Sequence, residues 1–118
     1  MLQDEVIMHW IDEYGVATKF TFMVYGQLQA EEVDLLIKGL VLQLEGKYTT
    51  KNMAVFFDEI NEEQAVAWNT YRGTSLAFIF AGDILKYEPL VQAIIEDGLE
   101  FLKYKAEYIS GDRSFSNV

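Results

Sequence analysis

The chain contains no cysteine, a single proline and a single histidine in 118 residues. The absence of cysteine excludes a disulfide framework, a thiol nucleophile and a thiolate metal site. Because proline occurs once and the eight glycines are scattered singly, no stretch has the composition of a flexible linker. With 51% hydrophobic residues, the sequence predicts one compact domain over residues 1–118, in which residues 110–118 form a polar, flexible tail.

Long apolar segments are also missing. The two longest stretches without a charged residue, Phe20–Ala30 and Gly73–Gly82, are well short of the roughly 18 apolar residues that a membrane-spanning helix needs. The first residues, MLQDEV, have neither the basic region nor the apolar core of a secretory signal. The sequence therefore predicts a cytoplasmic protein without a membrane-spanning segment.

Basic residues are scarce. Nineteen acidic residues against nine basic ones give a net charge of −10. Contact with nucleic acid or with an anionic membrane needs a basic face, so both partners are excluded. A negative field of this size speeds the encounter with a basic protein partner, and it also keeps a protein soluble. Both interpretations of the charge remain open.

The first 25 residues predict a β-hairpin. Val6–Ile11 has apolar residues on both faces, and Val16–Tyr25 alternates apolar and polar side chains with the period of a half-buried strand. A helical first segment is the alternative. From Ala30 to Glu45, apolar residues recur at three- and four-residue spacings, which predicts an amphipathic helix that ends at Gly46.

Short apolar runs then alternate with helical patterns. Met53–Phe57 and Leu76–Phe80 have the composition of buried strands. Between them, Asn61 is followed three residues later by Gln64, which is a capping-box pattern. We therefore expect a short helix from this point to about Tyr71.

Pro89 stands where the first residue of a last helix would be, and we expect this helix to continue to Ile109. Gly98 lies inside its apolar stripe, where a missing side chain would let the helix approach the sheet. The stripe itself consists of Val91, Ile95, Leu102 and Ile109.

These elements predict a domain of the α/β or α+β class, with a mixed sheet of about four strands and about three helices packed on it. The opening hairpin is antiparallel. The two strand–helix–strand units that come after it favour parallel pairing through right-handed crossovers.

The segment Asp58–Glu63 contains four carboxylates within six residues, at the end of a predicted strand. Asp58, Glu59, Glu62 and Glu63 offer oxygen ligands for a hard cation, or a negative surface for a basic protein partner. The spacing lacks the alternating acidic positions and the central glycine of a calcium loop. The same residues also suit the solvated start of a helix, so all three interpretations remain open.

Asp58 and Asp83 each follow an apolar strand directly. If the two strands are parallel neighbours, both carboxylates leave the same edge of the sheet, where open α/β folds bind ligands. Such a pair could bind magnesium or share a proton. Aspartate is also a common residue at the end of a strand, where its side chain caps the next turn of the chain.

His9 and two aromatic residues complete the set of candidate side chains. His9 is the sole histidine and lies within the first predicted strand, where a half-buried structural imidazole is expected rather than a catalyst. Trp68 and Tyr71 follow the acidic segment, and an aromatic pair beside carboxylates has the composition of an interface hot spot. Packing in the core explains Trp68 equally well.

The order of the predicted elements and the stretch YGQLQAEEVDLLIKGL, which precedes a short apolar strand, resemble the STAS-type regulatory domains of anti-sigma antagonists. The resemblance covers about half of the chain. Those domains offer a serine for phosphorylation near a helix start, and this sequence has INEEQ at that place.

The sequence leads to the hypothesis of a small acidic protein-binding module. It would block a basic, nucleic-acid-handling protein partner, as toxin-immunity and phage anti-defence proteins do, without catalysis and without a cofactor; a homodimer is compatible with this role. The alternatives are a STAS-like regulatory or assembly domain and a metal-dependent enzyme that uses Asp58 and Asp83. The predicted partner-binding residues are Asp58, Glu59, Glu62, Glu63, Trp68, Tyr71 and Asp83.

The charge balance makes one direct prediction. At physiological salt the purified protein should bind neither duplex nor single-stranded nucleic acid, because its nine basic residues are spread over the whole chain. A gel-shift assay with excess protein measures this. A retarded band would contradict the argument from charge.

Overall fold

The computed structural model describes residues 2–49, 51–70 and 72–115. The elements are, in chain order, α1 (Gln3–Tyr14), β1 (Val16–Tyr25), α2 (Ala30–Gln43), β2 (Met53–Glu59), α3 (Glu62–Ala67), β3 (Thr74–Ala81), a short 3₁₀ turn η1 (Leu85–Tyr87), α4 (Glu88–Phe101) and β4 (Lys105–Phe115).

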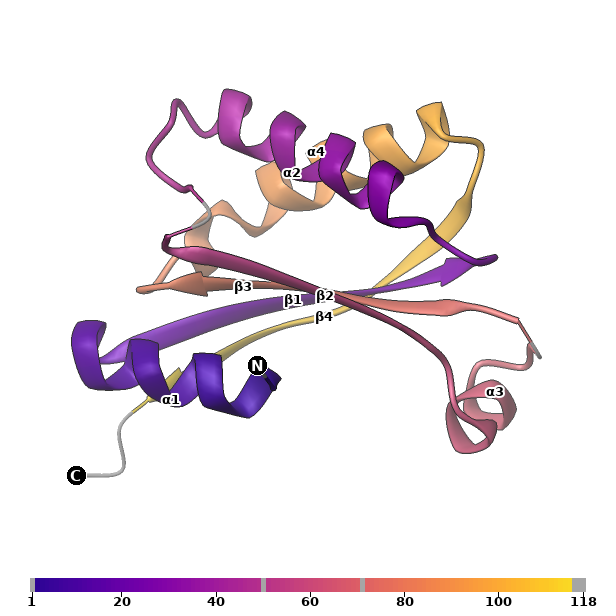
Figure 1. Ribbon diagram of the computed structural model, residues 1–118, viewed down its shortest axis with the longest axis horizontal. Helices are drawn as coiled ribbons and strands as arrows, with labels where there is room; N and C mark the ends of the chain where they lie inside the picture. Colours follow the sequence, from indigo (N-terminus) through magenta and orange to yellow (C-terminus); the bar gives the residue numbers. More distant parts are fainter. Residues whose placement is uncertain (1, 50, 71, 116–118) are drawn as a thin grey trace.

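The four strands form one sheet in the order β2-β3-β1-β4, and every neighbouring pair is antiparallel (Figure 1). As a consequence, β1 and β2 run in the same direction with β3 between them, and β3 and β4 run in the same direction with β1 between them. The connections through α2 and α4 therefore join parallel strands that are not neighbours, which is a split βαβ topology. The predicted α+β domain with a four-stranded sheet is confirmed.

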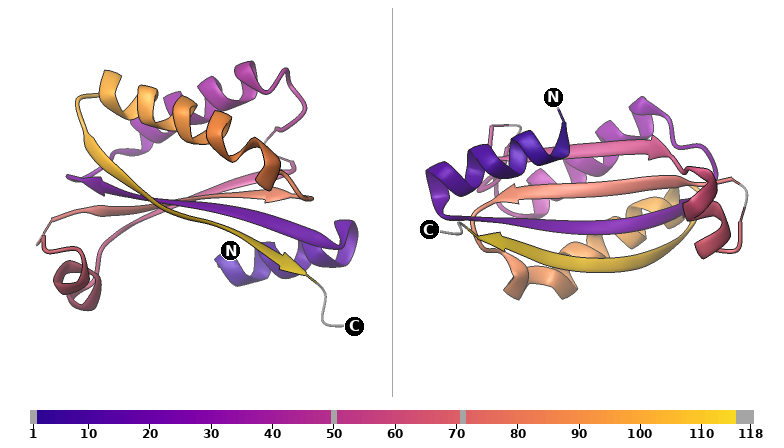
Figure 2. Two further views of the ribbon diagram at one scale, coloured as in Figure 1. Left: turned by 180° about the vertical axis from the view of Figure 1, so that it is seen from behind. Right: turned by 90° about the horizontal axis from the view of Figure 1, so that it is seen from below.

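The helices cover the two faces of the sheet unequally. Helices α2 and α4 lie on one face, α1 lies on the other, and α3 lies at one end of the sheet on the same side as α1 (Figures 1 and 2). The larger core fills the space between the sheet and α2 and α4. The smaller core joins the sheet to α1 and consists of Val6, Trp10, Ile11, Ala17, Ile79 and Ala81.

The N-terminal segment is a helix, so the predicted hairpin is wrong. Val6 and Trp10, four residues apart, lie on one face of α1 and are buried against the sheet, whereas Met8 is 59% exposed. A strand over these residues would place all three on one side. The sheet presents small side chains here, Ala17 and Ala81, which let a helix pack closely.

The predicted parallel pairing is wrong for β2 and β3, which are antiparallel neighbours. The helix of a parallel crossover must run back along the whole strand, and β2, with seven residues, is about 23 Å long. The helix in this connection, α3, has six residues and ends at Ala67, short of the predicted end at about Tyr71. The chain therefore turns back at the end of β2 instead of crossing the sheet.

The last predicted helix is too long. Helix α4 ends at Phe101, Lys103 adopts a left-handed backbone conformation with φ +67°, and β4 begins two residues later. From Tyr104, side chains alternate with a period of two, and Tyr104, Ala106 and Tyr108 pack against the larger core. Residues 110–115 of the predicted tail belong to β4, and residues 116–118 lie outside the described residues.

Two tyrosine–glutamate hydrogen bonds fasten β4 and the residue before it to the helical layer. Tyr104 donates to Glu32 of α2 at 2.7 Å, and Tyr108 donates to Glu88 of α4. The hydrogen bond to Glu32 raises the pKa of Tyr104 to about 12. Burial, together with the bond to Glu88, raises the pKa of Tyr108 further. Both hydroxyls therefore stay protonated as donors at neutral pH.

Gly98 allows α4 to approach α2 closely, whereas the sequence predicts a close approach to the sheet. A Cβ atom at Gly98 would lie 2.6 Å from Cδ2 of Leu36, and Leu36 is itself buried at 3% exposure. In α2, by contrast, Gly39 has nothing within 4 Å of the position of a Cβ atom. The two helical glycines thus differ in the space around them.

This difference predicts opposite effects of one substitution. Gly39→Ala should raise the free energy of unfolding by about 0.5–1 kcal/mol, because alanine has the higher helix propensity. Gly98→Ala gains the same propensity but pushes against Leu36, so we expect a net loss of about 1–2 kcal/mol. Urea unfolding measures both. A Gly98→Ala variant more stable than the parent would show that α2 and α4 are not in close contact there.

Candidate functional site

The predicted acidic residues form one exposed group at the end of β2. Asp58 and Glu59 end the strand, Glu62 and Glu63 lie in the first turn of α3, and all four are exposed. We call these four residues the acidic cluster. The predicted capping box between them is confirmed, because Asn61 accepts a hydrogen bond from the backbone N–H of Gln64 at 2.8 Å and the Gln64 side chain accepts one in return.

The charge of the acidic cluster is not neutralised within the described residues. The two contacts between basic and acidic side chains found there join His9 to Glu13 at 3.4 Å and Arg113 to Asp83 at 3.1 Å, and neither involves the cluster. The described part of the chain also holds no group of three or more histidine and acidic side chains that could bind a metal ion. The cluster therefore has the character of a free negative surface.

Helix α1 adds to this surface. Its first residues and the end of β2 enclose a hollow of about 540 Å³, lined by Leu2, Gln3, Asp4, Phe56 and Asp58. Seen from below, α1 and α3 lie at opposite ends of one face of the sheet (Figure 2). The hollow thus brings Asp4 to Asp58 beside an aromatic side chain. Asp4 was not predicted as a site residue, because the hairpin interpretation gave no sign that its segment crosses β2.

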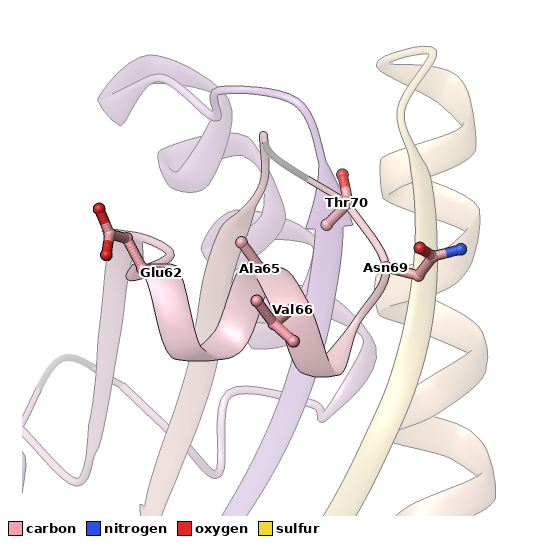
Figure 3. A pocket seen from close by; sticks show the side chains of 5 residues that line it. All are labelled: Glu62, Ala65, Val66, Asn69 and Thr70. Carbon is pink, nitrogen blue, oxygen red and sulfur yellow. The ribbon is translucent and has the colours of Figure 1, made fainter.

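A second hollow lies on α3 and has a volume of about 650 Å³. Figure 3 shows Glu62 and Asn69 at its two ends, with Ala65 and Val66 on the helix between them. Val66 is 82% exposed, which places an apolar side chain one turn after the carboxylate of Glu62. Apolar and acidic groups are therefore mixed on this surface.

The two predicted aromatic site residues have different outcomes. Trp68 directly follows the last residue of α3 and is half-buried, and its backbone N–H donates to the carbonyl of Gln64 at 2.8 Å. It therefore lies beside the acidic cluster, partly accessible. Tyr71 lies outside the described residues.

Asp83 lies at the opposite end of the sheet from the acidic cluster. Because β2 and β3 are antiparallel, Asp58 pairs with Ser75 near the start of β3, whereas Asp83 follows the end of that strand. The predicted pairing of Asp58 with Asp83 is therefore wrong, and with it the two-carboxylate site.

Asp83 has a local role instead. Its carboxylate accepts hydrogen bonds from the backbone N–H of Leu85 at 3.2 Å and from Arg113 at 3.1 Å. The bond from Leu85, followed by that from Arg113, lowers the pKa of Asp83 below its usual value. The resulting stabilisation is complete above about pH 4 and is lost as the pH falls through the lowered pKa.

His9 also differs from its prediction. It lies on the exposed side of α1, with its Nε2 atom 3.4 Å from the carboxylate of Glu13 one turn later, and both side chains are more than half exposed. It is neither half-buried nor part of a strand. Such an exposed pair contributes little to stability.

Comparisons with known protein families, with curated proteins and with solved structures find no match for this chain. The resemblance to STAS-type domains rested partly on the order of elements. That order is not reproduced, because the first element is a helix and all neighbouring strands are antiparallel. None of the helices among the described residues has the length and apolar content that crossing a bilayer requires.

The separation of the two aspartates predicts the response to divalent cations. Millimolar magnesium, manganese or calcium should leave the melting temperature unchanged, because Asp58 and Asp83 lie at opposite ends of the sheet and the described residues form no group of three or more ligands that could hold a metal ion. Thermal melts with each cation and with a chelator measure this, with Asp58→Asn and Asp83→Asn as comparisons. Asp83→Asn should melt slightly lower because it loses the pair with Arg113. A rise with one cation that disappears in both variants would restore the metal site.

Proposed function

We propose that this protein is an acidic protein-binding module that docks on the basic surface of a protein partner and blocks it. It would act as an inhibitor or immunity-type protein towards a nucleic-acid-handling enzyme in the cytoplasm. The observation that carries the proposal is the acidic cluster, whose four carboxylates are exposed together and form no ion pair within the described residues.

The fold has little use for this concentration of charge. Glu62 and Glu63 complement the dipole of α3, but Asp58 and Glu59 end a strand and neither cap a helix nor pair with a cation among the described residues. Grouped like charges repel one another, so the arrangement costs free energy in the isolated protein. The basic residues of a partner would attract these carboxylates and so offset their mutual repulsion. The net charge of −10 would speed the encounter of the two proteins.

Apolar surface beside the carboxylates supports a protein partner over a small cation. Val66 is 82% exposed on α3, Trp68 is partly accessible, and Phe56 lines the hollow that it shares with Asp4 and Asp58. Protein interfaces combine an apolar or aromatic centre with a polar rim. The carboxylates would occupy the places that substrate phosphates take on the partner, and the apolar groups would hold the complex together.

Two matched variants test the proposal. The cluster variant carries Asp58→Asn, Glu59→Gln, Glu62→Gln and Glu63→Gln. The control variant carries Glu45→Gln, Glu96→Gln, Asp97→Asn and Glu100→Gln, which are exposed carboxylates in the turn after α2 and on α4. Both variants change the net charge by the same amount, so only the place of the charge differs.

In pull-downs from an extract of the native host, the parent and the control variant should capture the same basic protein, and the cluster variant should lose it. The association rate with that protein should fall at least tenfold between low and high ionic strength, because screening removes the steering. Equal capture by both variants would contradict the proposal, and so would a rate that does not respond to salt.

A further inference from the structure

The two edges of the sheet differ in how they are protected. An exposed edge strand invites pairing with another chain, and proteins commonly prevent this with charged residues, bulges or short strands. Strand β4 has such devices, because its ladder with β1 shifts register at Thr21/Phe22 and the strand carries Lys105, Glu107, Asp112 and Arg113.

Strand β2 has none of these devices before its last two residues. It reads MAVFFDE, and its ladder with β3 runs without a shift from Met53 opposite Phe80 to Glu59 opposite Thr74. Ala54 to Phe57 are each only partly buried. The outer edge of β2 thus combines unpaired backbone groups with accessible apolar side chains on both faces.

The hydrogen bonds at the two ends of the ladder show which backbone groups point outward. The N–H of Ala81 donates to the carbonyl of Asn52 at 2.9 Å, and the N–H of Ile60 donates to the carbonyl of Gly73 at 3.1 Å. Even-numbered residues of β2 therefore bond to β3. The N–H and C=O groups of the odd-numbered residues, among them Val55 and Phe57, point away from the sheet.

We propose that two copies of this chain pair their β2 strands antiparallel about a twofold axis, so that one sheet continues through both copies. The symmetry centre lies at Val55, because this centre aligns the outward groups of Met53, Val55 and Phe57 with one another. It places Val55 opposite Val55 and Met53 opposite Phe57 on one face, and Ala54 opposite Phe56 on the other, so apolar side chains meet on both faces of the sheet.

Charge complementarity favours a second copy as the occupant of this edge. Lys51 precedes β2 and the acidic cluster ends it. In this antiparallel pair, Lys51 comes opposite Glu59 of the other copy, which is the last residue of β2. A lysine would therefore lie opposite a carboxylate of the acidic cluster twice per dimer. The edge is thus complementary to itself in charge as well as in hydrophobicity.

The outer side of α2 adds apolar surface next to this edge. A groove of about 600 Å³ is lined by Asp34, Ile37, Lys38, Val41 and Leu42 of α2 and by Thr49, which lies shortly before β2. Leu42 is 79% exposed. A second copy paired along the edge of β2 would cover part of this groove. A partner that contributed only a single strand would leave the groove open.

Light scattering after gel filtration, at about 0.15 M salt, tests the proposal on the unmodified protein. We expect twice the 13.6 kDa mass of one chain. Val55→Pro removes an outward N–H without breaking a bond to β3, which an edge strand tolerates, and should be monomeric. Val55→Thr keeps the N–H and should remain a dimer. Circular dichroism verifies that both variants are folded.

Single cysteines give an independent test, because the chain has none of its own. Residues opposite their own counterparts at a twofold axis have Cα atoms about 4.5–5.5 Å apart, which a disulfide can span. Under mild oxidation, Val55→Cys should crosslink rapidly into a dimer. Ser114→Cys on the opposite edge should not.

A monomeric parent protein at about 0.1 mM would overturn the proposal. A dimer that persists in folded Val55→Pro, or that crosslinks through Ser114→Cys and not through Val55→Cys, would overturn it as well. These results do not depend on the basic partner of the proposed function, since only this chain is present.

Discussion

The burial of β3 on both of its faces is the constraint on which the rest of the structure depends. Leu76, Phe78 and Phe80 point to the larger core, and Ala77, Ile79 and Ala81 point to the other face. Each large side chain that is removed from water contributes about 1.5–3 kcal/mol. A strand of this kind is stable only with a strand on each side and a helical layer over each face, which is the arrangement that β1, β2, α1, α2 and α4 provide.

Two buried threonines hold the chain at the two ends of this central pair of strands. The hydroxyl of Thr74 donates to the carbonyl of Gly26 at 2.7 Å and accepts from the N–H of Leu28 at 3.1 Å. Thr18 does the same at the other end, with Gly82 at 2.8 Å and Ile84 at 3.1 Å. Backbone groups that are buried without partners would be costly. These bonds fix where β1 and β3 end, and hence where their connections leave the sheet.

The acidic groups lie outside the two cores of the protein. The turn from β2 into α3 extends beyond the sheet, so the four carboxylates of the acidic cluster are exposed to solvent, and the amphipathic helix α1 carries Asp4 to the same face. The stabilising contacts and the proposed binding contacts are therefore made by different residues. The surface charges can therefore change without loss of the fold. The β2 edge is the exception, because its apolar side chains contribute both to the stability of the fold and to the proposed binding contacts.

The sequence by itself determined the elements whose signals are local. The period of two in β1, the stripe of α2, the capping box of Asn61 and the unbroken apolar runs of β2 and β3 depend on neighbouring residues, and all of these elements are present in the structure. Tertiary structure decided the rest. Val6 to Ile11 suits a strand or a helix, and contact with Ala17 and Ala81 selects the helix. Strand β4 forms because β1 offers it backbone groups for a hydrogen-bonded ladder. The strand directions, which separate Asp58 from Asp83, result from packing between residues that are far apart in the chain.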